Sequence, residues 1–572
     1  MKASDLIADV LKLKGVPCVF ELAGGMITHL LDSFCRRGLR TISVHHEQSA
    51  AFAADAVGRI TGIPGVAVAT SGPGATNLIT GIGSCFFDSS PAVFITGQVN
   101  RNEQKGSRPV RQLGFQETDI VTLARSLTKD SWQVQTPQEV PQALESAFRL
   151  AVSGRPGPVL LDIPMDVQRM EVDSTGARAE PEVDVPRPDA SCLLEILSVL
   201  EQARRPIVLA GGGIRASRAL AAFRAMVERL GLPVVHSLMA VDALPYGHPL
   251  RVGLIGTYGN RWANLALSRA DAVVVIGSRL DIRQTGSDLA SFAAGKTIYH
   301  IDIDPGEVNN RVSGCRAVLC DIRAFLADLS QACAGRDLPR CEPWLKEIAE
   351  LKASWPDTGE QPGLTGINPN AFMHQLSQRL ASAAGYVVDV GQHQMWAAQS
   401  LELGERQFFM TSGGMGSMGF ALPAAMGASA AIGPSPVAVI AGDGGFQLNI
   451  QELETVSHNR LPLKMVIVDN RCYGMVRQFQ EAYFDSRFQS TVWGYSAPDF
   501  ARVASAYGIA SMTVREPGEV PRGLDWLGRE PLEPQLLCVA VSSQAGAHPK
   551  VAFGRALDQM EPDLKPSRTN IR

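Results

Sequence analysis

The chain has 572 residues, of which 45% are hydrophobic, and its formal net charge is −4 at pH 7. This length predicts roughly three or four domains with large buried cores, and the slightly acidic balance argues against a nucleic-acid surface. Residues 1–15 read as an amphipathic helix rather than a signal peptide, and no apolar run reaches the roughly 18–20 residues that span a bilayer. The ten cysteines form no CxxC pair, so we expect reduced thiols in a cytoplasmic protein.

From the start of the chain to about residue 170, helical patterns alternate with short β-rich runs. The runs cover residues 18–20, 41–44, 65–69, 92–96 and 158–163. This alternation is typical of a mostly parallel α/β sheet, so residues 1–170 are predicted to form the first domain. A stretch rich in proline and charge, residues 169–191, follows and is predicted to be a linker.

The same alternation recurs in residues 192–335 and in residues 367–550, which we predict to be the second and third domains. Polar residues 334–366, which contain one helical piece, separate them and are predicted to be the second linker. Residues 551–572 form a polar tail that is either mobile or folded over a site. The predicted fold class is therefore α/β with three doubly wound parallel sheets, and the similar size of the blocks suggests one architecture used three times.

The third segment contains a βαβ unit in residues 436–475. Asp443 follows its first apolar run and Asn470 follows its second. Because the strands of such a unit are parallel and the connection is right-handed, both residues are expected at the carboxyl ends of strands, where open α/β sheets bind ligands. Their side-chain oxygens, together with the backbone carbonyl of Cys472, suit Mg²⁺. An ordinary turn with a solvated aspartate is the alternative.

Three further features are ambiguous when they are read alone. Glu47 begins an alanine-rich helical pattern, where a carboxylate could simply favour the helix N-terminus. Residues 70–77 could be any glycine-rich βα loop. Residues 211–213 follow a strand and precede a helix, but they lack the full GxGxxG spacing of a dinucleotide fingerprint.

The spacing of Gly442-Asp443-Gly444 and Asn470 resembles the diphosphate–magnesium motif of thiamine-diphosphate enzymes. The surrounding sequence resembles the large catalytic subunit of acetolactate (acetohydroxyacid) synthase, and the likeness extends over residues 1–550. It implies a pyrimidine-binding domain, a central FAD-type domain and a diphosphate-binding domain. The cofactors implied are thiamine diphosphate, Mg²⁺ and FAD, the last of these structural rather than redox-active in acetolactate synthases.

On this resemblance, HHEQSAAFAADAVGR is the catalytic glutamate segment and Glu47 is the catalytic acid. In that family the glutamate bonds a nitrogen of the aminopyrimidine ring and promotes the tautomer that deprotonates the thiazolium, which needs a desolvated acid with a raised pKa. Phe115 and Gln116 would line the acetyl pocket with Lys129 nearby, although each alone could be packing or surface. Simple pyruvate decarboxylases carry adjacent histidines near that place, so Phe115-Gln116 favours ligation over aldehyde release.

Two motifs of the third segment also match the family. The first, VGQHQMW, implies that the diphosphate meets Gly391, Gln392, His393 and Gln394, with Gly442 and Gly444 beside them. The second, SGGMGSMG in residues 412–419, resembles the loop that holds the pyrimidine. The backbone of Gly416 would accept a hydrogen bond from that ring, and Met418 would wedge between the two cofactor rings. Read alone, the motifs could be a helix N-terminus and a core methionine.

The second segment carries the acceptor and flavin residues that the resemblance implies. SRLDIRQT, residues 278–285, is similar to the family segment in which an arginine binds the acceptor's carboxylate. Arg283 takes that role, a bidentate task that arginine does well, and its alternative is a surface arginine. Arg155, Gly212 and Asp302 match places where these enzymes hold FAD.

The chain departs from the usual acetolactate synthase in several places. GMVRQFQ, residues 474–480, contains the predicted substrate residues Met475 and Phe479, and Phe479 stands where the family has a tryptophan that helps to select the acceptor. Residues 100–114 are longer and more basic than the usual loop, and residues 485–495 and 553–560 also differ. These departures resemble a subset encoded with polysaccharide genes, which includes the carboligase of yersiniose biosynthesis.

The resulting hypothesis is a thiamine-diphosphate-dependent carboligase that decarboxylates pyruvate and adds the two-carbon unit to a second carbonyl. The acceptor is either a second 2-keto acid, which gives acetolactate, or a ketone such as a nucleotide-activated keto-deoxysugar. The resemblance implies a homodimer or homotetramer in which Glu47 of one chain faces the Asp443 site of another. The rivals are an oxidase that uses FAD for redox and an inert cofactor-binding regulator, which the presence of Glu47, Asp443 and Asn470 disfavours.

Overall fold

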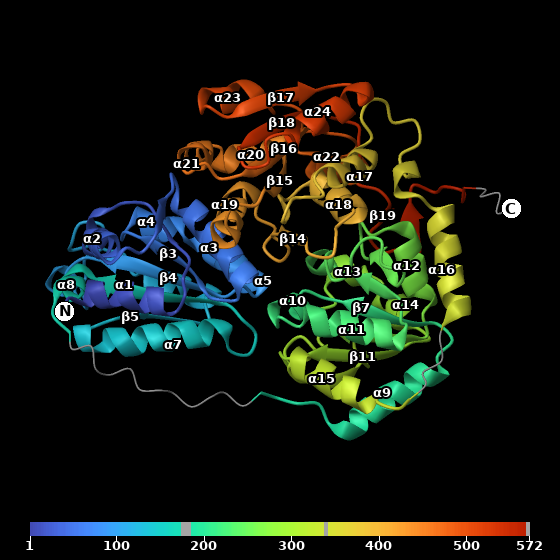
Figure 1. Cartoon of the computed structure of the whole chain (residues 1–572), viewed down its shortest axis with the longest axis horizontal. Helices are drawn as coiled ribbons and strands as arrows, with labels where there is room; N and C mark the ends of the chain where they lie inside the picture. The colour runs from blue at the N-terminus through green and yellow to red at the C-terminus, as the bar shows by residue number, and fades with distance from the viewer. Residues whose placement is uncertain (173–184, 337–340, 568–572) are drawn as a thin grey trace.

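Three six-stranded sheets follow one another along the chain in the computed structural model, which describes residues 1–172, 185–336 and 341–567. All strand pairs within these sheets are parallel. Helices pack on both faces of each sheet (Figure 1). Successive strand residues such as Ile207 and Val208 therefore belong to hydrophobic cores on opposite faces. The predicted α/β class with three doubly wound parallel sheets is confirmed.

The first sheet has the strand order β2-β1-β3-β4-β6-β5. Its strands are β1 (Val19–Glu21), β2 (Thr41–Ser43), β3 (Gly65–Ala69), β4 (Ala92–Gln98), β5 (Asp130–Gln133) and β6 (Pro158–Pro164). The helices around it are α1 (Ala3–Leu13), α2 (Thr28–Arg37), α3 (Glu47–Thr61), α4 (Pro73–Asn77), α5 (Ile79–Asp88), α6 (Ile120–Ala124), α7 (Val140–Val152) and α8 (Met165–Arg169). Every residue of β3, β4 and β6 is buried, as expected for inner strands of a parallel sheet.

The central sheet has the order β12-β11-β10-β7-β8-β9. Its strands are β7 (Pro206–Ala210), β8 (Val234–His236), β9 (Arg251–Leu254), β10 (Ala272–Ile276), β11 (Thr297–Asp302) and β12 (Arg316–Leu319). Its helices are α9 (Ala190–Gln202), α10 (Gly213–Ala216), α11 (Leu220–Leu230), α12 (Arg261–Arg269), α13 (Ile282–Thr285), α14 (Leu289–Ala293), α15 (Ile322–Ala332) and α16 (Glu342–Ser354). Helix α16 lies in the predicted second linker, but it packs on this sheet because the buried Trp344 donates from Nε1 to Pro206 O at 3.1 Å.

The third sheet has the order β14-β13-β15-β16-β18-β17. Its strands are β13 (Gly385–Val388), β14 (Phe408–Thr411), β15 (Val437–Gly442), β16 (Leu463–Asp469), β17 (Ala510–Val514) and β18 (Gln535–Ala540). Its helices are α17 (Pro369–Arg379), α18 (Gln392–Ser400), α19 (Ala421–Ile432), α20 (Asp443–Phe446), α21 (Glu452–His458), α22 (Gly474–Tyr483), α23 (Phe500–Ala506) and α24 (Val520–Leu527). Strands β15 and β16 pair directly, so the predicted βαβ unit is present.

The expectation of one architecture used three times is wrong for the middle block. Counted from the first strand of each sheet, the first and third sheets both run 2-1-3-4-6-5. The central sheet runs 6-5-4-1-2-3, which is the dinucleotide-binding order 3-2-1-4-5-6 read from the other edge. Hydrophobic alternation shows how many strands a segment has, but it does not show which strands lie side by side.

One hydrophobic core joins the first and third sheets. It includes Phe20 and Ala67 of the first sheet and Val437 and Val439 of the third. Helices α3 and α19 meet in this core so closely that a Cβ on Gly427 would lie 2.0 Å from the backbone oxygen of Ala53. The alanines after Glu47 are therefore small because a second helix packs against them.

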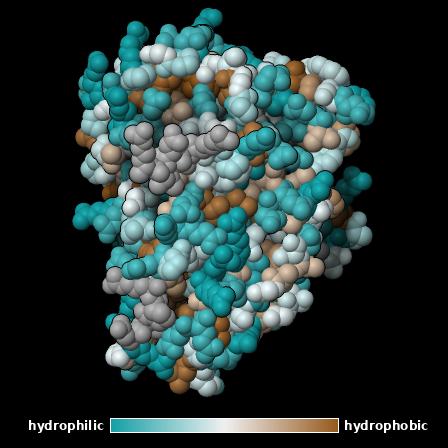
Figure 2. Space-filling model, turned by 90° about the vertical axis from the view of Figure 1, so that its right-hand side faces the viewer, coloured by the Kyte–Doolittle hydropathy of each residue, from teal (hydrophilic) through white to brown (hydrophobic). Residues whose placement is uncertain are grey.

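Residues 551–567 of the predicted C-terminal tail fold onto the central domain. Strand β19 (Lys550–Val551) pairs antiparallel with β20 (Met560–Glu561), and Val551 N donates to Thr257 O at 2.8 Å. In Figure 2, which views the side of the molecule with the tail, hydrophobic residues form small separate groups among hydrophilic ones. No helix in the described parts of the chain has the length and apolar character to cross a membrane. Three parts of the predicted linkers and tail lie outside the described residues: residues 173–184 of the first linker, 337–340 of the second linker and 568–572 of the tail.

Candidate active site

The carboxyl ends of β15 and β16 bring the predicted metal residues together. Gly442 is the register partner of Val468, so Asp443 and Asn470 follow neighbouring strands, and both are buried. Asn470 Oδ1 accepts from Cys472 N at 3.2 Å, and Asn470 Nδ2 donates to Gln392 Oε1 at 3.1 Å. The βαβ unit thus places a carboxylate, an amide oxygen and a turn of backbone at one point of the sheet edge.

Asp443 is an unusual carboxylate. Burial raises its pKa to about 7; the hydrogen bond from the Tyr495 hydroxyl, 2.7 Å from Oδ2, opposes that shift, and the charge of Asp469 adds to it. A cation would favour the ionised form of such a group. Sequence reasoning missed Tyr495, which lies in a stretch noted only as different from the family. No local pattern marks it, because the loop must fold back before the contact exists.

His393 and two glycines form the floor beside these residues. A Cβ on Gly391 would lie 2.6 Å from His393 Cε1, and a Cβ on Gly442 would lie 2.9 Å from His393 Nδ1. Burial lowers the pKa of His393 to about 3, so its imidazole is neutral. Its Nε2 is buried without a hydrogen-bond partner among the described residues. The ring of His393 therefore lies directly against the backbone of both glycines, and its Nε2 is a polar atom that no other described residue uses.

The loop that carries Met418, residues 412–419, is held at both ends. At its start, Asp88 accepts from the backbone of Gly413 at 3.1 Å and of Gly414 at 2.6 Å. At its end, Gly419 N donates to Asp389 Oδ1 at 3.0 Å. Met418 itself is half-buried, and Gly416 has a φ of +66°, which glycine adopts without strain. The sequence flagged the loop but not its two carboxylate anchors.

Glu47 begins α3 at the carboxyl edge of the first sheet. Its side chain is buried, and Oε2 accepts from Asn77 Nδ2 at 2.9 Å. Nearby, Gln116 has a left-handed φ of +64°, and a Cβ on Gly72 would lie 2.9 Å from Gln116 Cβ. Phe115 is 77% exposed. The first domain thus brings Glu47, the glycine-rich loop and the Phe115-Gln116 segment to one edge.

Lys129 does not join that group within the chain. It immediately precedes β5, at the amino ends of the strands, whereas Glu47 follows the carboxyl end of β2. Its ammonium donates to the backbone oxygen of Ser153. The family resemblance implied that Lys129 lies near the acetyl pocket, but α6 carries the chain back across the sheet before Lys129 is reached.

A cavity of about 160 Å³ lies between the central and third domains. Its lining includes Arg283 and Tyr258 from the central domain and Gly391, Gln394 and Met475 from the third. The predicted acceptor arginine and the predicted diphosphate loop therefore line the same cavity. Phe479 is not part of this lining. It is 54% exposed and packs on Tyr483, with ring centroids 4.7 Å apart.

A larger cavity of about 360 Å³ adjoins the first. Its lining includes Arg155, Gly212 and Asp302, the three residues predicted to hold a flavin. It lies where β7 and β10 are neighbours, which is the switch point of the central sheet and the usual nucleotide position in this topology. Arg155 is already paired, since Nη1 lies 3.0 Å from Asp304 Oδ2 and 2.5 Å from Glu307 Oε1.

Comparisons with known proteins agree with this arrangement. Three thiamine pyrophosphate enzyme models match the chain: the N-terminal TPP binding domain over residues 1–123, the central domain over residues 193–329 and the C-terminal TPP binding domain over residues 389–529. The acetolactate synthase isozyme 2 large subunit of Escherichia coli is 36% identical and covers 98% of this chain and 99% of its own length. The chain belongs to the acetolactate synthase large-subunit family of thiamine pyrophosphate enzymes.

Other members of the family show the same full-length likeness. The probable acetolactate synthase large subunit of Methanocaldococcus jannaschii is 36% identical over 99% of this chain and 97% of its own. The acetolactate synthase large subunit of Lactococcus lactis is 36% identical over 97% of this chain and 95% of its own. Glu47 and Gln116 lie in the matched N-terminal domain and Asp443 and Asn470 in the matched C-terminal domain. Lys129 falls outside both matches.

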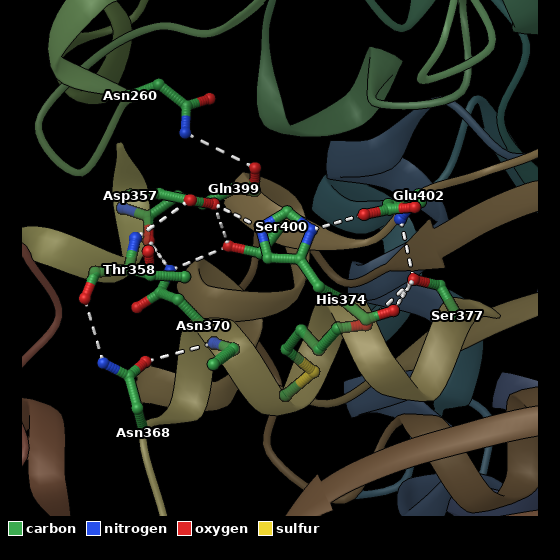
Figure 3. A network of polar contacts seen from close by, with 12 residues as sticks. Asn260, Asp357, Thr358, Asn368, Asn370, His374, Ser377, Gln399, Ser400 and Glu402 are labelled. Carbon is green, nitrogen blue, oxygen red and sulfur yellow. Dashed lines mark hydrogen bonds and ion pairs between the residues drawn. The ribbon is translucent and has the colours of Figure 1, made fainter. Parts of the chain in front are cut away.

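A buried polar network supports one wall of the smaller cavity in this family member. Gln399 donates to the backbone oxygen of Tyr258 at 2.8 Å, and Asn370 donates to Gln399 Oε1 at 2.9 Å. Figure 3 shows how the network continues to His374, whose ring lies between Asp357 and Glu402 at 2.9 Å from each. The network thereby ties the second linker and the third domain to the central-domain wall that carries Tyr258.

Proposed function

We propose that the chain is a thiamine-diphosphate-dependent, C–C bond-forming carboligase of the acetolactate synthase type. It decarboxylates pyruvate and transfers the two-carbon unit to a carbonyl acceptor. The observation that carries the proposal is the placement of Asp443 and Asn470 at neighbouring strand ends beside the unpartnered Nε2 of His393. The relatives named acetolactate synthase, similar over nearly the whole chain, support the reaction class.

The cofactor site fits thiamine diphosphate and Mg²⁺ by its donor set. Asp443, Asn470 and the carbonyl of Cys472 would hold the cation, which prefers oxygen ligands and shares them with phosphate. No group of three His, Cys, Asp or Glu side chains suited to a metal occurs in the described residues, so amide and backbone oxygens are needed. The diphosphate would be met by Gly391, Gln392, His393, Gln394, Gly442 and Gly444. When bound, thiamine diphosphate supplies the group that stabilises negative charge on the reacting carbon.

The chain's own residues orient the reaction. Glu47 would hold a proton at a ring nitrogen of the pyrimidine, in a buried setting from which water is largely excluded. Gly416 and Met418 would hold the pyrimidine in place, while Phe115 and Gln116 would face pyruvate. Arg283 and Met475 line the smaller cavity, which suits an acceptor carboxylate next to the diphosphate loop.

We propose that the active site is shared in a homodimer or homotetramer. Among the described residues, no hydrogen bond or ion pair joins the Glu47 carboxylate to the third domain, and the carboxylate bonds only Asn77. Several apolar side chains near the half-sites are exposed, including Phe115 at 77%, Leu448 at 51% and Met415 at 40%. A second copy that covered them would bring a glutamate to each diphosphate site.

FAD is proposed as a structural cofactor in the larger cavity. The cavity volume of about 360 Å³ falls in the range of small-molecule sites. Two glycines of its lining let the backbone after β7 and the backbone after β10 approach closely, because a Cβ on Gly213 would lie 2.7 Å from Gly277 Cα. Asp302 and Gly212 would contact the nucleotide; Arg155 could reach a phosphate only by exchanging its present acidic partners. Flavin absorbance and fluorescence of the purified protein test this proposal.

We also propose limits for the domains and a compartment for the protein. We propose domains at residues 1–170, 192–335 and 367–550 with a tail at 551–572; each of the first three ranges encloses one sheet. All ten cysteines are free thiols, which supports a reducing, cytoplasmic compartment.

The acceptor is proposed to be a second 2-keto acid. Arg283 in the cavity favours an acceptor with a carboxylate. The second candidate is a ketone such as a nucleotide-activated keto-deoxysugar, as in the yersiniose-type subset. It rests on the exposed aromatic group of Phe479, Tyr483 and Phe484, and the named relatives give it no support.

Product analysis separates the two candidates. The purified protein, supplied with thiamine diphosphate and Mg²⁺, is incubated with pyruvate alone and with pyruvate plus a ketone. Acetolactate formed in the ratio of one to two pyruvates consumed supports the first candidate. Slow turnover of pyruvate alone that accelerates with the ketone, with the adduct identified by mass, supports the second.

A further inference from the structure

Asp162 is a buried carboxylate that the proposed mechanism does not use. It lies near the end of β6 with 1% of its surface exposed. Oδ1 accepts from Thr96 Oγ1 at 2.8 Å, and Oδ2 accepts from Gln133 Nε2 at 2.8 Å and from Gln98 Nε2 at 3.1 Å. This carboxylate on β6 thus binds side chains at the carboxyl ends of both neighbouring strands, β4 and β5.

Gln98 connects this carboxylate to the substrate loop. The same Nε2 that donates to Asp162 also donates to the backbone oxygen of Thr118 at 2.7 Å. Its Oε1 accepts from Val99 N at 3.1 Å, which fixes the orientation of the amide. Because a primary amide has two N–H donors, one Gln98 nitrogen can serve both acceptors at once.

The loop that Gln98 holds is under two further constraints. Gln116, two residues before Thr118, has a φ of +64°, a conformation that residues other than glycine adopt rarely. Glu117 bonds both limbs of the preceding loop, since its carboxylate accepts from Lys105 N at 2.6 Å and Leu113 N at 2.8 Å. A side chain in an uncommon backbone conformation needs surroundings that hold it there.

We propose that Asp162 and Gln98 are positioning residues that hold the Phe115-Gln116 segment against the glycine-rich loop beside Glu47. The chain of contacts runs from Asp162 through Gln98 to Thr118 and fixes the end of the segment. Gln116 then lies against Gly72, in the loop that also approaches Glu47: a Cβ on Gly74 would be 3.1 Å from Glu47 Oε1. Burial raises the pKa of Asp162 to about 6, opposed by its three side-chain donors, so the group is ionised and accepts from all three at neutral pH. The role of the segment in binding pyruvate rests on the proposed function.

A matched pair of substitutions tests the proposal. Gln98→Met and Gln133→Met each remove one amide donor from Asp162 Oδ2, but only Gln98 also bonds the loop. Trypsin cleavage after Lys105 and Arg111, followed by fragment mass, reports the opening of the loop without reference to activity. Gln98→Met is expected to accelerate this cleavage about tenfold, the effect of losing the buried hydrogen bond to Thr118 O that holds the loop. Gln133→Met is expected to leave the cleavage near the wild-type rate.

Kinetics give the second readout. Gln98→Met is expected to raise KM for pyruvate about tenfold with a smaller change in kcat, while the affinity for thiamine diphosphate stays unchanged. Equal cleavage rates for the two methionine variants would overturn the positioning role, whatever reaction the protein performs. Faster cleavage of Gln98→Met without any effect on pyruvate turnover would support the role of Gln98 in holding the loop but contradict the proposed function of the segment.

Two more variants keep the test decisive. If Gln98→Met does not fold, Asp162→Asn takes its place, because the amide presents an N–H where three donors now point, and the same faster cleavage is expected. Gln116→Gly removes the need to hold a side chain at positive φ, so Gln98→Met combined with Gln116→Gly should be cleaved more slowly than Gln98→Met alone. Equal rates for the single and double variants would contradict the proposal.

Discussion

Ser49 Oγ donates to Asn449 Oδ1 at 3.0 Å, and this contact joins the helix that begins at Glu47 to the third domain. The amide nitrogen of Asn449 in turn donates to the backbone oxygen of Gly419 at 2.8 Å, at the end of the loop that carries Met418. Asp88 anchors the start of the same loop from the first domain. The two half-sites of one chain are therefore fixed relative to each other by buried polar contacts as well as by the shared core.

Replacing Ser49 with alanine tests this connection. The substitution leaves the buried Oδ1 of Asn449 without its shorter donor, so we expect a loss of about 1–3 kcal/mol in unfolding free energy. Urea unfolding measures it. Ser505→Ala, at an exposed position with a comparable local hydrogen bond, is the control and should change stability by less. Similar losses of unfolding free energy in the two variants would show that the Ser49 contact stabilises the protein no more than an exposed hydrogen bond does.

Replacing Glu47 with glutamine tests the catalytic assignment. The amide keeps the size of the side chain but cannot exchange a proton, so carbon dioxide release from pyruvate should fall by at least about a hundredfold. Binding of thiamine diphosphate, followed by calorimetry, should change little. Glu145→Gln, which alters only a partly exposed ion pair with Lys14, serves as the matched control. Turnover of the Glu47→Gln protein at the wild-type rate would exclude the assignment.

Magnesium binding should depend on pH through Asp443. A metal ligand must be deprotonated, and the pKa of Asp443 is raised to about 7 by burial. We therefore expect the apparent Mg²⁺ affinity, in the presence of thiamine diphosphate, to fall by up to about tenfold for each pH unit below 7. Fluorescence titration across about pH 6–8 measures it.

The Tyr495 hydroxyl supplies a second test of the same group. Its hydrogen bond to Asp443 lowers the pKa that burial raises. Tyr495→Phe should therefore move the midpoint of the magnesium titration to higher pH. Tyr507→Phe, at the residue that directly follows α23, is the control and should leave the midpoint in place. Magnesium binding that is independent of pH in the wild type would contradict the role of Asp443.

His374 should make the free energy of unfolding fall as the pH rises. Burial disfavours its charge, but the hydrogen bonds and charges of Asp357 and Glu402 outweigh burial and raise its pKa. Since the folded pKa is above the unfolded value of about 6.5, the stabilisation is complete below about pH 6.5 and is lost as the pH rises through the folded pKa. Burial alone would raise the pKa of Asp357, but the hydrogen bond and charge of His374 lower it. The contribution of the Asp357 carboxylate to stability is therefore lost only in acid.

The expected result is a difference in unfolding free energy between wild type and His374→Gln that becomes smaller as the pH rises. His374→Gln should be less stable than wild type by about 1–3 kcal/mol in mildly acidic solution, and the gap should narrow as the pH rises. Thermal unfolding at several pH values measures it. His458→Gln, at the end of α21, controls for loss of a histidine elsewhere. A gap that stays constant with pH would mean that the charge of His374 does not contribute.

The sequence by itself determined the local framework of the site. Apolar runs predicted strands that end at Asp443 and Asn470, and the structure places both residues at neighbouring strand ends. The periodicity after Val44 predicted a helix that begins at Glu47, where α3 begins. These features follow from residues close together in the chain, because strand and helix periods and turn glycines act over a few residues.

Only the tertiary structure decided which distant residues meet. It gave the central sheet a different strand order, directed Tyr495 onto Asp443 and placed Lys129 at the opposite edge from Glu47. It also left Phe479 outside the cavity that Arg283 lines. Such outcomes depend on how whole elements pack against one another, since buried polar groups find partners only after helices and sheets have docked. Local patterns therefore identified the chemistry, and packing across the chain decided its geometry.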